Sequence, residues 1–574
     1  MPQRKKIGIF LCSCGDTISK AVNFKKIIDY FKSFKEVKLI EENSFLCKPE
    51  TLFNFKKKIK DNNLSGLIVV ACSPQLKGTF FKKAVEEAGL NFNLLSLVNL
   101  REQCAMVYKE KESSTKSAID SIASALRRIK LQLPIASKTV KIEQNTLVIG
   151  GGIAGLQTAI NLSKLGHLVV LLERESFLGG NININSVSLI KYDHNNINLK
   201  EVVNKKIEEV NNNSQIQIFT QAELIKLEGS VGNFKATIEI KDKDRKKEIK
   251  NLNVGSVVLA TGCQKFFPSE KYGINLSSQI ISQTQLQGLI NSGNDSFKGI
   301  SSICFVSGII CDDQRLKGDE LLKQVLFLTT NYKIQIYIIC KNVYVAEDGL
   351  EEIYQQAREK GIIFLKYDQK KPEIKLRTST NKIEVSLYDP LLGKDFYDEG
   401  KELVISCDLL VLEEEIIPAP GTKKLSEILQ ISCDEEGFYQ QKNISLQPVF
   451  TNRKGIFVVG ACRGLKNVIQ TLDDSGMVSL EIHNLLKEKL VKYNLDRAIV
   501  DDDKCTLCLT CLRTCPHKAI QLDQDEELNQ VKIKINDLAC EGCGICVSQC
   551  PASALNLSKY EDDQIIAEIA VQMT

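Results

Sequence analysis

The chain has 574 residues, of which 43% are hydrophobic and 25% charged, a composition that excludes long disorder, collagen and coiled coil. Its 75 basic and 71 acidic residues leave a formal net charge of +4, too small an excess to indicate a nucleic-acid partner. Trp is absent and aromatic residues make up only 6%, which also disfavours base-stacking platforms. At about 150 residues per domain, the length predicts three or four domains.

The N-terminus carries a short apolar segment between basic residues and a cysteine. Ile7–Leu11 precedes Cys12 and superficially resembles a lipoprotein signal. Its apolar core has five residues, against the ~7 to 15 of such a signal, so we predict a first strand instead. No apolar run reaches the ~18 residues of a membrane span. We therefore expect a cytoplasmic protein with no membrane span, whose 20 cysteines serve metal or redox chemistry rather than disulfides.

Residues 1 to about 130 have the pattern of a small α/β domain. Apolar runs predict strands at Lys6–Leu11 and Gly66–Ala71. Amphipathic periodicity predicts helices at about 23–34, 50–61, 78–88 and 116–131.

Five cysteines of this segment lie near predicted strands and turns: Cys12, Cys14, Cys47, Cys72 and Cys104. Their spacing is not that of a standard cluster motif. On periodicity alone, buried and inert thiols are the favoured interpretation.

A complete βαβ unit follows. Thr146–Ile149 reads as a strand, Leu156–Leu165 as a helix and Leu168–Leu172 as a second strand, ending at Glu173. Between the first strand and the helix lies a G-x-G-x-x-G loop, Gly150–Gly155. In such a loop the first glycine permits the tight turn, the second lets the backbone approach a pyrophosphate, and the third lets helix and strand pack closely. The pyrophosphate would lie at the helix N-terminus, and Glu173 would accept from the ribose hydroxyls.

His167, between the helix and the second strand, is expected to be a solvated loop residue and not a ligand.

Later segments favour FAD over NAD. Leu178–Asn181 contains a Gly-Gly-Asn turn directly after the acid, and Val257–Gly262 is a strand ending in Ala-Thr-Gly, both typical of flavoproteins with two dinucleotide-binding domains. Gly455–Gly460 matches the late strand that meets the flavin, but Ala461 stands where such proteins typically carry an Asp for the ribityl chain. The candidate FAD-binding residues are Gly150, Gly152, Ile153, Ala154, Gly155, Glu173, Arg174, Gly179, Gly180, Asn181, Ala260, Thr261, Gly262, Gly460 and Ala461.

The segment where a second dinucleotide, NAD(P)H, would bind is poor in glycine. After the apolar run from Ile303, only Gly308 is present where the loop should have three glycines. This region also has no C-x-x-C dithiol. Both absences argue against a thioredoxin-reductase-like activity and favour a flavin that exchanges electrons with clusters.

Two cysteine motifs near the C-terminus carry the strongest signal. Each reads C-x2-C-x2-C-x3-C-P, at Cys505–Pro516 and at Cys540–Pro551, the pattern of two-cluster bacterial ferredoxins in which the fourth cysteine of each motif serves the other cluster. Zinc knuckles are the alternative, but zinc needs no second motif with crossed partners. One [4Fe-4S] cluster is therefore assigned to Cys505, Cys508, Cys511 and Cys550, and the other to Cys540, Cys543, Cys546 and Cys515.

The chain closely resembles the A-type subunit of heterodisulfide reductase, which is an iron–sulfur flavoprotein. The likeness runs through nearly the whole length, on the glycine loop, the paired ferredoxin motifs and the segments Cys12–Gly15, Ala71–Pro74, Ala84–Asn91, Asn99–Cys104, Leu178–Asn181, Gly232–Lys235, Ala357–Gly361 and Gly464–Asn467. The resemblance implies a further [4Fe-4S] cluster in the N-terminal domain, held by Cys47, Cys72 and Cys104 with Cys12 or Cys14. It also implies that Lys466 lies near the flavin ring, where a cation would favour the anionic reduced flavin. A solvated turn residue is the alternative for Lys466.

The chain departs from this family at three places. Lys241–Asn251 reads as a charged hairpin where relatives often insert a further ferredoxin domain. A Cys- and Arg-rich stretch is reduced to Cys304 and Cys311, and a late strand that often ends in a glycine turn reads Leu412–Glu415. The missing insertion weakens the case for electron bifurcation.

The combined prediction is a multidomain α/β protein with a small N-terminal α/β domain, a thioredoxin-reductase-like two-dinucleotide-binding FAD fold and a C-terminal two-[4Fe-4S] ferredoxin domain. The predicted parts are 1–134 (N-terminal domain), 140–263 (FAD-binding, first part), 264–400 (second dinucleotide-like region), 401–492 (FAD-binding, second part) and 497–574 (ferredoxin domain and tail), with a linker near Pro134–Gln144.

Such a chain would be an oxidoreductase that converts electron pairs at FAD into single electrons on clusters, with bifurcation or its reverse as a hypothesis. The resemblance implies a hetero-oligomer with partners of several kinds: heterodisulfide reductase B- and C-like subunits, a hydrogenase, formate dehydrogenase or other donor module, and ferredoxin. Two alternatives stay open. One is an NAD(P)H-dependent FAD oxidoreductase resembling the small subunit of glutamate synthase, and the other is a passive electron wire whose FAD is only structural.

Overall fold

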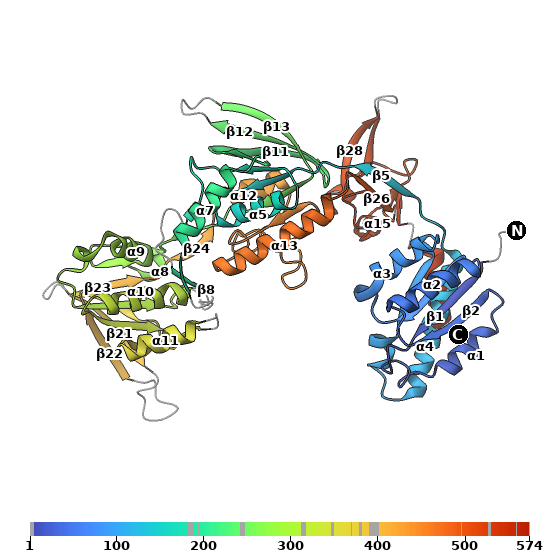
Figure 1. Ribbon diagram of the computed structural model, residues 1–574, viewed down its shortest axis with the longest axis horizontal. Helices are drawn as coiled ribbons and strands as arrows, with labels where there is room; N and C mark the ends of the chain where they lie inside the picture. The colour runs from blue at the N-terminus through green and yellow to red at the C-terminus, as the bar shows by residue number, and fades with distance from the viewer. Residues whose placement is uncertain are drawn as a thin grey trace. The chain divides into compact units, whose positions relative to one another are not determined.

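The computed structural model describes residues 5–181, 189–192, 195–241, 247–310, 317–345, 349–368, 370–377, 382–389, 401–494, 496–525, 530–557 and 560–572. The chain divides into two compact units (Figure 1). One comprises residues 1–140 together with 491–574, and the other comprises residues 141–490. Cys311, singled out above, lies outside the described residues.

The first unit begins with a four-stranded parallel sheet in the order β2-β1-β3-β4. Its strands are β1 (Ile7–Cys12), β2 (Val37–Asn43), β3 (Gly66–Ala71) and β4 (Leu95–Asn99). The central strands β1 and β3 are buried along their whole length, as their unbroken apolar runs require. The predicted first strand is thus confirmed, whereas β2 and β4 were not anticipated.

Helices cover both faces of this sheet. They are α1 (Phe24–Lys32), α2 (Pro49–Asp61), α3 (Pro74–Glu87) and α4 (Lys111–Leu131), which confirms the four predicted helices. Because side chains alternate along a strand, Ile9 of β1 packs in one core with Phe31 of α1, while Phe10 packs in the other with Phe55 of α2.

The second unit contains the predicted βαβ fold. Its parallel sheet has the order β10-β7-β6-β14-β25. The strands are β6 (Thr146–Ile149), β7 (Val169–Leu172), β10 (Ile216–Phe219), β14 (Ser256–Leu259) and β25 (Ile456–Val458). Helices α5 (Ile153–Lys164) and α13 (Val468–Leu486) pack against each other (Figure 1).

A three-stranded antiparallel sheet of β11 (Ala222–Ser230), β12 (Asn233–Lys241) and β13 (Lys247–Val254) is inserted before β14. Strands β12 and β13 pair antiparallel up to Lys241 opposite Lys247, as the predicted hairpin requires; residues 242–246 of the charged segment lie outside the described residues.

The same unit holds a second parallel sheet that repeats the first. Its order is β16-β23-β17-β18-β19. The strands are β16 (Ile280–Ser282), β17 (Ser302–Ser307), β18 (Gln335–Cys340), β19 (Ile363–Lys366) and β23 (Leu409–Leu412). The two sheets have the same arrangement when the second is taken in reverse order. Its strands then run β19-β18-β17-β23-β16 and occupy the places of β10-β7-β6-β14-β25 in the first sheet. The predicted two-dinucleotide-binding architecture is therefore present.

The ferredoxin segment belongs to the first unit. It contains the strand pairs β27 (Ala498–Val500) with β30 (Leu555–Leu557) and β28 (Ile520–Asp525) with β29 (Gln530–Ile535). Short helices α14 (Thr510–Thr514) and α15 (Ile545–Ser548) follow the cysteine loops.

The last helix, α16 (Asp562–Gln572), packs on α4 of the N-terminal domain. Arg128 of α4 forms an ion pair with Glu568 at 3.2 Å, and its guanidinium lies over the ring of Tyr560 at 5.0 Å. Among the described residues, no helix is both long and apolar enough to cross a membrane.

His167 is not the solvated loop residue that was expected. Only 4% of its surface is exposed, and its Nε2 lies 3.0 Å from Nδ1 of His483 on α13. The tight turn after α5 brings His167 under the end of α13, a long-range contact that has no local sequence signal. Burial, followed by the charge of His483, lowers the pKa of His167.

This histidine pair predicts a pH-dependent stability. Because the pKa of His167 is lower in the folded chain than its unfolded value of 6.5, the unfolded state binds more protons below that pH. The free energy of unfolding should then fall as the pH drops from 7.5 through 6.5 toward the folded pKa, by at most about 1.4 kcal/mol per pH unit. Urea unfolding at several pH values measures this slope. His167→Leu should flatten it; an equal slope in the His167→Leu chain would contradict the prediction.

Candidate functional site

The glycine loop between β6 and α5 has the geometry of a dinucleotide cradle. Gly150 has a φ of +112°, and a Cβ there would come within 2.3 Å of the Ala260 carbonyl oxygen. A Cβ on Gly155 would come within 1.9 Å of the Gly150 carbonyl oxygen, so both positions exclude a side chain. At Gly152, by contrast, a Cβ would meet nothing within 4 Å. Open space therefore lies at the start of α5, where backbone N–H groups favour an anion.

Glu173 and the Gly-Gly-Asn turn lie next to the glycine loop, a position that their predicted roles require. Glu173 Oε2 accepts from the N–H of Gly151 at 2.6 Å. The N–H of Gly179 donates to the Gly151 carbonyl at 2.8 Å, and Gly152 forms a bridge with Gly179. The side chain of Asn181 reaches in another direction, with Nδ2 donating to the Cys263 carbonyl at 2.7 Å.

Arg174 lies at the rim of this site. Its Nη1 donates to the carbonyl of Pro420 at 2.8 Å, and its Nε lies 3.2 Å from Glu175 Oε1. It is thus held away from the glycine loop.

The strand ends of β14 and β25 meet beside the cradle. The N–H of Ala260 donates to Ile149, and the N–H of Val459 donates to Leu259. These bonds align Ala260, Thr261 and Gly262 with Gly460 and Ala461 at one edge of the sheet, where ligands bind in parallel α/β folds.

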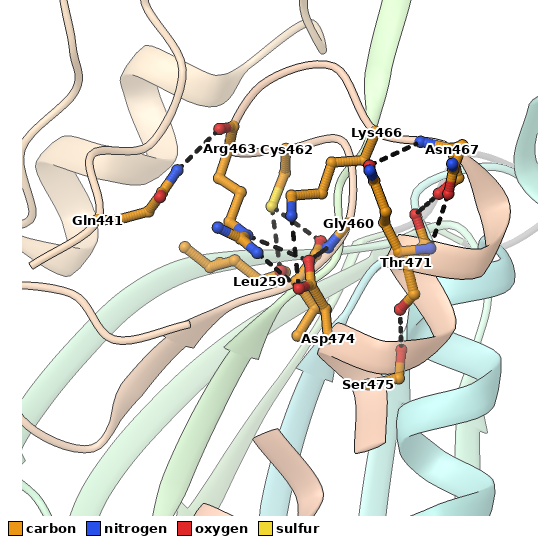
Figure 2. A network of polar contacts seen from close by, with 12 residues as sticks. Leu259, Gln441, Gly460, Cys462, Arg463, Lys466, Asn467, Thr471, Asp474 and Ser475 are labelled. Carbon is orange, nitrogen blue, oxygen red and sulfur yellow. Dashed lines mark hydrogen bonds and ion pairs between the residues drawn. The ribbon is translucent and has the colours of Figure 1, made fainter. Parts of the chain in front are cut away.

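A buried carboxylate lies at this edge although Ala461 is not an Asp (Figure 2). Asp474 of α13 accepts from the N–H of Gly460 at 3.2 Å. Its two oxygens also bind Arg463, at 3.2 Å to Nε and 2.6 Å to Nη2. Sequence reasoning missed both residues, because neither has a motif spacing and the pair forms only when α13 folds back on the turn.

Lys466 joins this pair. Its Nζ lies 3.6 Å from Asp474 Oδ1, so one carboxylate faces two cations (Figure 2). Burial lowers the pKa of Lys466, the charge of Arg463 lowers it further, and Asp474 opposes both effects. Asn467 then caps α13 by accepting from the N–H of Gln470 at 2.7 Å, which fixes where the turn ends.

Cys462 is buried beneath the same turn. Its thiol lies 3.2 Å from the carbonyl oxygens of Leu259 and Val459, and burial raises its pKa to about 12. A neutral thiol that donates to the strand ends is a packing group rather than a nucleophile.

These residues fit a flavin dinucleotide. The cradle offers open space and N–H groups for a pyrophosphate, and the turn from Gly460 to Lys466 carries a net positive charge. Gln441 donates through Nε2 to the Arg463 carbonyl at 3.0 Å, while its buried Oε1 finds no partner among the described residues. A buried acceptor without a donor is rare, and a bound polar group would supply one.

The ferredoxin cysteines gather into two sets, the same two that the motif predicts. Cys505, Cys508, Cys511 and Cys550 line one cavity. Cys515, Cys540, Cys543 and Cys546 line another. Apart from Thr506 in the first and His517 in the second, the other side chains of both linings are apolar, which suits a cluster held by thiolates.

The two loops repeat one another in detail. Gly542 and Gly544 have φ values of +67° and +81°, and Leu507 and Leu509 take the same left-handed conformation at the corresponding positions, with +55° and +61°. Such a φ costs a non-glycine residue about 1–2 kcal/mol, so the first loop carries a cost that the second avoids.

The sulfurs of the crossing cysteines are hydrogen-bonded alike. The N–H of Ala519 donates to Cys515 Sγ at 3.4 Å, and the N–H of Ala554 donates to Cys550 Sγ at 3.3 Å. Hydrogen bonds to sulfur raise the reduction potential of a cluster.

In the N-terminal domain, the five cysteines lie at or after the ends of the four parallel strands: Cys12 and Cys14 at β1, Cys47 after β2, Cys72 after β3 and Cys104 after β4. Burial raises the pKa of Cys12, and the charges of Cys14 and Cys47 add to that shift. Burial also raises the pKa of Cys72; the nearby Arg101 lowers it and Cys14 raises it. Arg101 Nη1 lies 3.7 Å from Cys14 Sγ.

Cys104 follows β4 and is buried. Its Sγ is 3.6 Å from Ser117 Oγ of α4, and burial raises its pKa while this hydrogen bond opposes the shift. Cys14 packs against the same buried cluster that contains Cys104.

Comparison with known proteins finds family models for two parts of the chain and relatives for most of its length. A family model described as pyridine nucleotide-disulphide oxidoreductase matches residues 144–289, and one described as a 4Fe-4S dicluster domain matches residues 497–563. The A-type iron-sulfur subunit of CoB–CoM heterodisulfide reductase from Methanocaldococcus jannaschii is 26% identical over 98% of both chains. The A-type subunit of the H(2):CoB-CoM heterodisulfide,ferredoxin reductase from Methanothermobacter thermautotrophicus is 24% identical over 91% of both. Among solved structures, thioredoxin reductase of Lactococcus lactis is 18% identical, covers 60% of this chain and 99% of its own, and has a TM-score of 0.41.

A flavin-type dinucleotide fold and a two-cluster ferredoxin domain in one chain define an iron–sulfur flavoprotein, which is an oxidoreductase. With relatives that match nearly its whole length, this chain is similar to the A-type subunit of heterodisulfide reductase. The resemblance predicted from the sequence is thereby confirmed.

The crossed arrangement of cysteines can be tested by substitution. Cys515→Ser should remove about four irons per chain, and the cluster lost should be the one in the cavity of Cys546. Its electron paramagnetic resonance spectrum after reduction should therefore match that of Cys546→Ser and differ from that of Cys511→Ser. Cys433→Ser, outside these cavities, is the control and should keep all signals. A Cys515→Ser spectrum like that of Cys511→Ser would contradict the crossing.

Proposed function

We propose that this chain is the FAD- and iron–sulfur-dependent electron-transfer subunit of a heterodisulfide reductase-like complex. The single observation that carries the proposal is that one chain combines a flavin-type glycine cradle with two four-cysteine cavities. Bound FAD would supply two-electron chemistry, and the clusters would pass electrons one at a time. The chain thus exchanges electron pairs with single electrons, and unequal potentials for the two electrons would make it a bifurcating or confurcating subunit.

The residues of the cradle bind and orient the flavin. The N–H groups at the start of α5, around Gly152, Ile153 and Ala154, hold the pyrophosphate, and Glu173 accepts from the ribose. Gly179 and Gly180 close the loop from the side of β7. The ends of β14 and β25 position the ring.

Lys466 is proposed as the cation next to the flavin ring. The turn in which Lys466 lies supports this proposal. Arg463 donates two hydrogen bonds to Asp474. Asp474 also accepts from the N–H of Gly460 and lies 3.6 Å from the ammonium group of Lys466. Two cations and one carboxylate leave a net charge of +1, which favours negative charge on a reduced flavin.

A third [4Fe-4S] cluster in the N-terminal domain is part of the proposal. Its proposed ligands are Cys47, Cys72 and Cys104 with Cys12 or Cys14, which follow the ends of neighbouring parallel strands. Arg101, whose Nη1 lies 3.7 Å from Cys14 Sγ, would stabilise their negative charge.

The proposed partners follow the names of the relatives. Those names combine heterodisulfide reductase with hydrogen, formate or ferredoxin, which supports B- and C-like subunits, a hydrogenase or formate dehydrogenase module, and ferredoxin as partners of a cytoplasmic hetero-oligomer. The proposed domains keep the boundaries 1–134, 140–263, 264–400, 401–492 and 497–574, and the division of the chain near residues 140 and 490 supports the outer ones.

An anaerobic redox titration of the reconstituted chain tests this function. Flavin and clusters should exchange electrons, and the flavin should take up both electrons at one potential if the chain bifurcates. Lys466→Met should lower that potential by about 20–40 mV, since 30 mV equals about 1.4 kcal/mol for a two-electron couple. Lys487→Met, an exposed lysine at the end of α13, is the control. Flavin that never exchanges electrons with the clusters would contradict the function, and two well-separated flavin potentials would contradict bifurcation.

Iron content tests the N-terminal cluster. Three clusters predict about twelve irons per chain and two predict about eight. Cys72→Ser and Cys104→Ser should each lower the value from about twelve to about eight, while Cys433→Ser, an equally conservative change in the second unit, should leave it unchanged. Eight irons in the unmodified chain would rule out the third cluster, and an unchanged value for Cys104→Ser would exclude Cys104 as a ligand.

A further inference from the structure

The segment from Tyr439 to Gln441 runs beside the turn that follows β25. The N–H of Tyr439 donates to the Cys462 carbonyl at 3.2 Å, and the N–H of Gln440 donates to the Ser432 carbonyl at 2.9 Å. Successive side chains of an extended segment alternate between its two sides. Tyr439 is fully buried and Gln440 is exposed, so the side chain of Gln441 lies on the buried side together with that of Tyr439.

The amide of Gln441 has one atom that is held and one that is not. Its Nε2 donates to the Arg463 carbonyl at 3.0 Å, which fixes the orientation of the amide because only the nitrogen can donate. Gln441 thus binds the main chain of Arg463, whereas Asp474 binds its side chain (Figure 2). The Oε1 of Gln441 is buried and has no hydrogen-bond partner among the described residues. Since a buried acceptor without a donor is costly, a ligand that brings a donor to this oxygen would be bound more tightly.

The carboxylate of the same turn is already committed. Asp474 accepts from the N–H of Gly460 and from two nitrogens of Arg463. Ala461, directly after Gly460 at the end of the strand, has only a methyl group and offers no side-chain acceptor. A donor that binds at this strand end would therefore find its acceptor in the Oε1 of Gln441.

Two buried hydroxyls indicate what kind of donor this is. The side-chain oxygens of Tyr439 and Thr261 also have no hydrogen-bond partner within the part of the chain that the structure describes. Thr261 follows β14, which pairs with β25 in parallel, so it lies at the same edge of the sheet as the turn. A hydroxyl can both donate and accept, whereas the Oε1 of Gln441 can only accept. This combination suits a ligand that carries several hydroxyl groups, as the ribityl chain of FAD does.

We propose that Gln441 is a further FAD-binding residue, whose Oε1 accepts a hydrogen bond from a hydroxyl of the ribityl chain. The hydroxyl supplies the donor that the buried oxygen lacks, and the bond from Nε2 to the Arg463 carbonyl holds the amide in place for it. Gln441 thereby provides the acceptor that Ala461 cannot provide. The inference rests on the proposed function, since it requires FAD in the first dinucleotide fold, and it assigns a role to a residue that no local motif marks.

Titration of the full, flavin-free chain with oxidised FAD, followed by flavin fluorescence, tests the proposal. Gln441→Met keeps the length of the side chain but removes the amide, and it should weaken FAD binding about five- to tenfold, as one lost hydrogen bond predicts. Gln441→Glu keeps an acceptor oxygen but cannot donate to the Arg463 carbonyl, and it should bind FAD at least about threefold more tightly than Gln441→Met. Gln440→Met, at the exposed neighbouring position, is the matched control and should bind FAD as the unmodified chain does.

A rescue variant tests whether the donor belongs to the ribityl chain. Ala461→Asp places a carboxylate at the end of the strand, and in the Gln441→Met chain it should restore FAD affinity to within about twofold of that of the unmodified chain. Failure of this rescue, or unchanged FAD affinity in Gln441→Met, would overturn the proposal. So would a Gln441→Glu chain that binds FAD about tenfold more weakly than the unmodified chain, a result that decides the matter if Gln441→Met does not fold. The redox titration measures electron exchange between flavin and clusters separately, so the proposed function can stand when this inference fails.

Discussion

Parallel strands bring their carboxyl ends to one edge of a sheet, and each candidate site in this protein depends on that constraint. In the N-terminal sheet the edge carries the cysteines that follow β1, β2, β3 and β4. In the FAD fold it joins the glycine loop, Glu173 and the turn at Gly460. One geometric rule therefore produces a group of thiols in one sheet and an anion cradle in another, according to which side chain follows each strand.

The turn after β25 illustrates how a buried charge is tolerated in this setting. Asp474 would be costly to bury alone, but two hydrogen bonds from Arg463 and one from the Gly460 N–H satisfy it. The same carboxylate lies next to Lys466, so the ammonium group is held in place by a residue that has no need to touch the flavin. Removing one partner of such a group leaves the others uncompensated, which is why the three side chains are best understood as one unit.

Much of the fold and of the site could be predicted from the sequence, and the parts that could not share a physical cause. The glycine loop, Glu173 and both cysteine motifs are local patterns whose spacing fixes their geometry, and the structure brings their residues together as expected. Arg463 and Asp474 lie only 11 positions apart, but they meet because α13 folds back on the turn, and no motif spacing signals that contact. His167 was misjudged because its partner His483 lies 316 positions away.

The docking of α16 on α4 has a consequence for how the chain is made. Residues 111–131 are synthesised more than 400 residues before the helix that packs on them. Domains tend to fold as they emerge, so the N-terminal sheet and its helices can form before this outer contact of α4 exists.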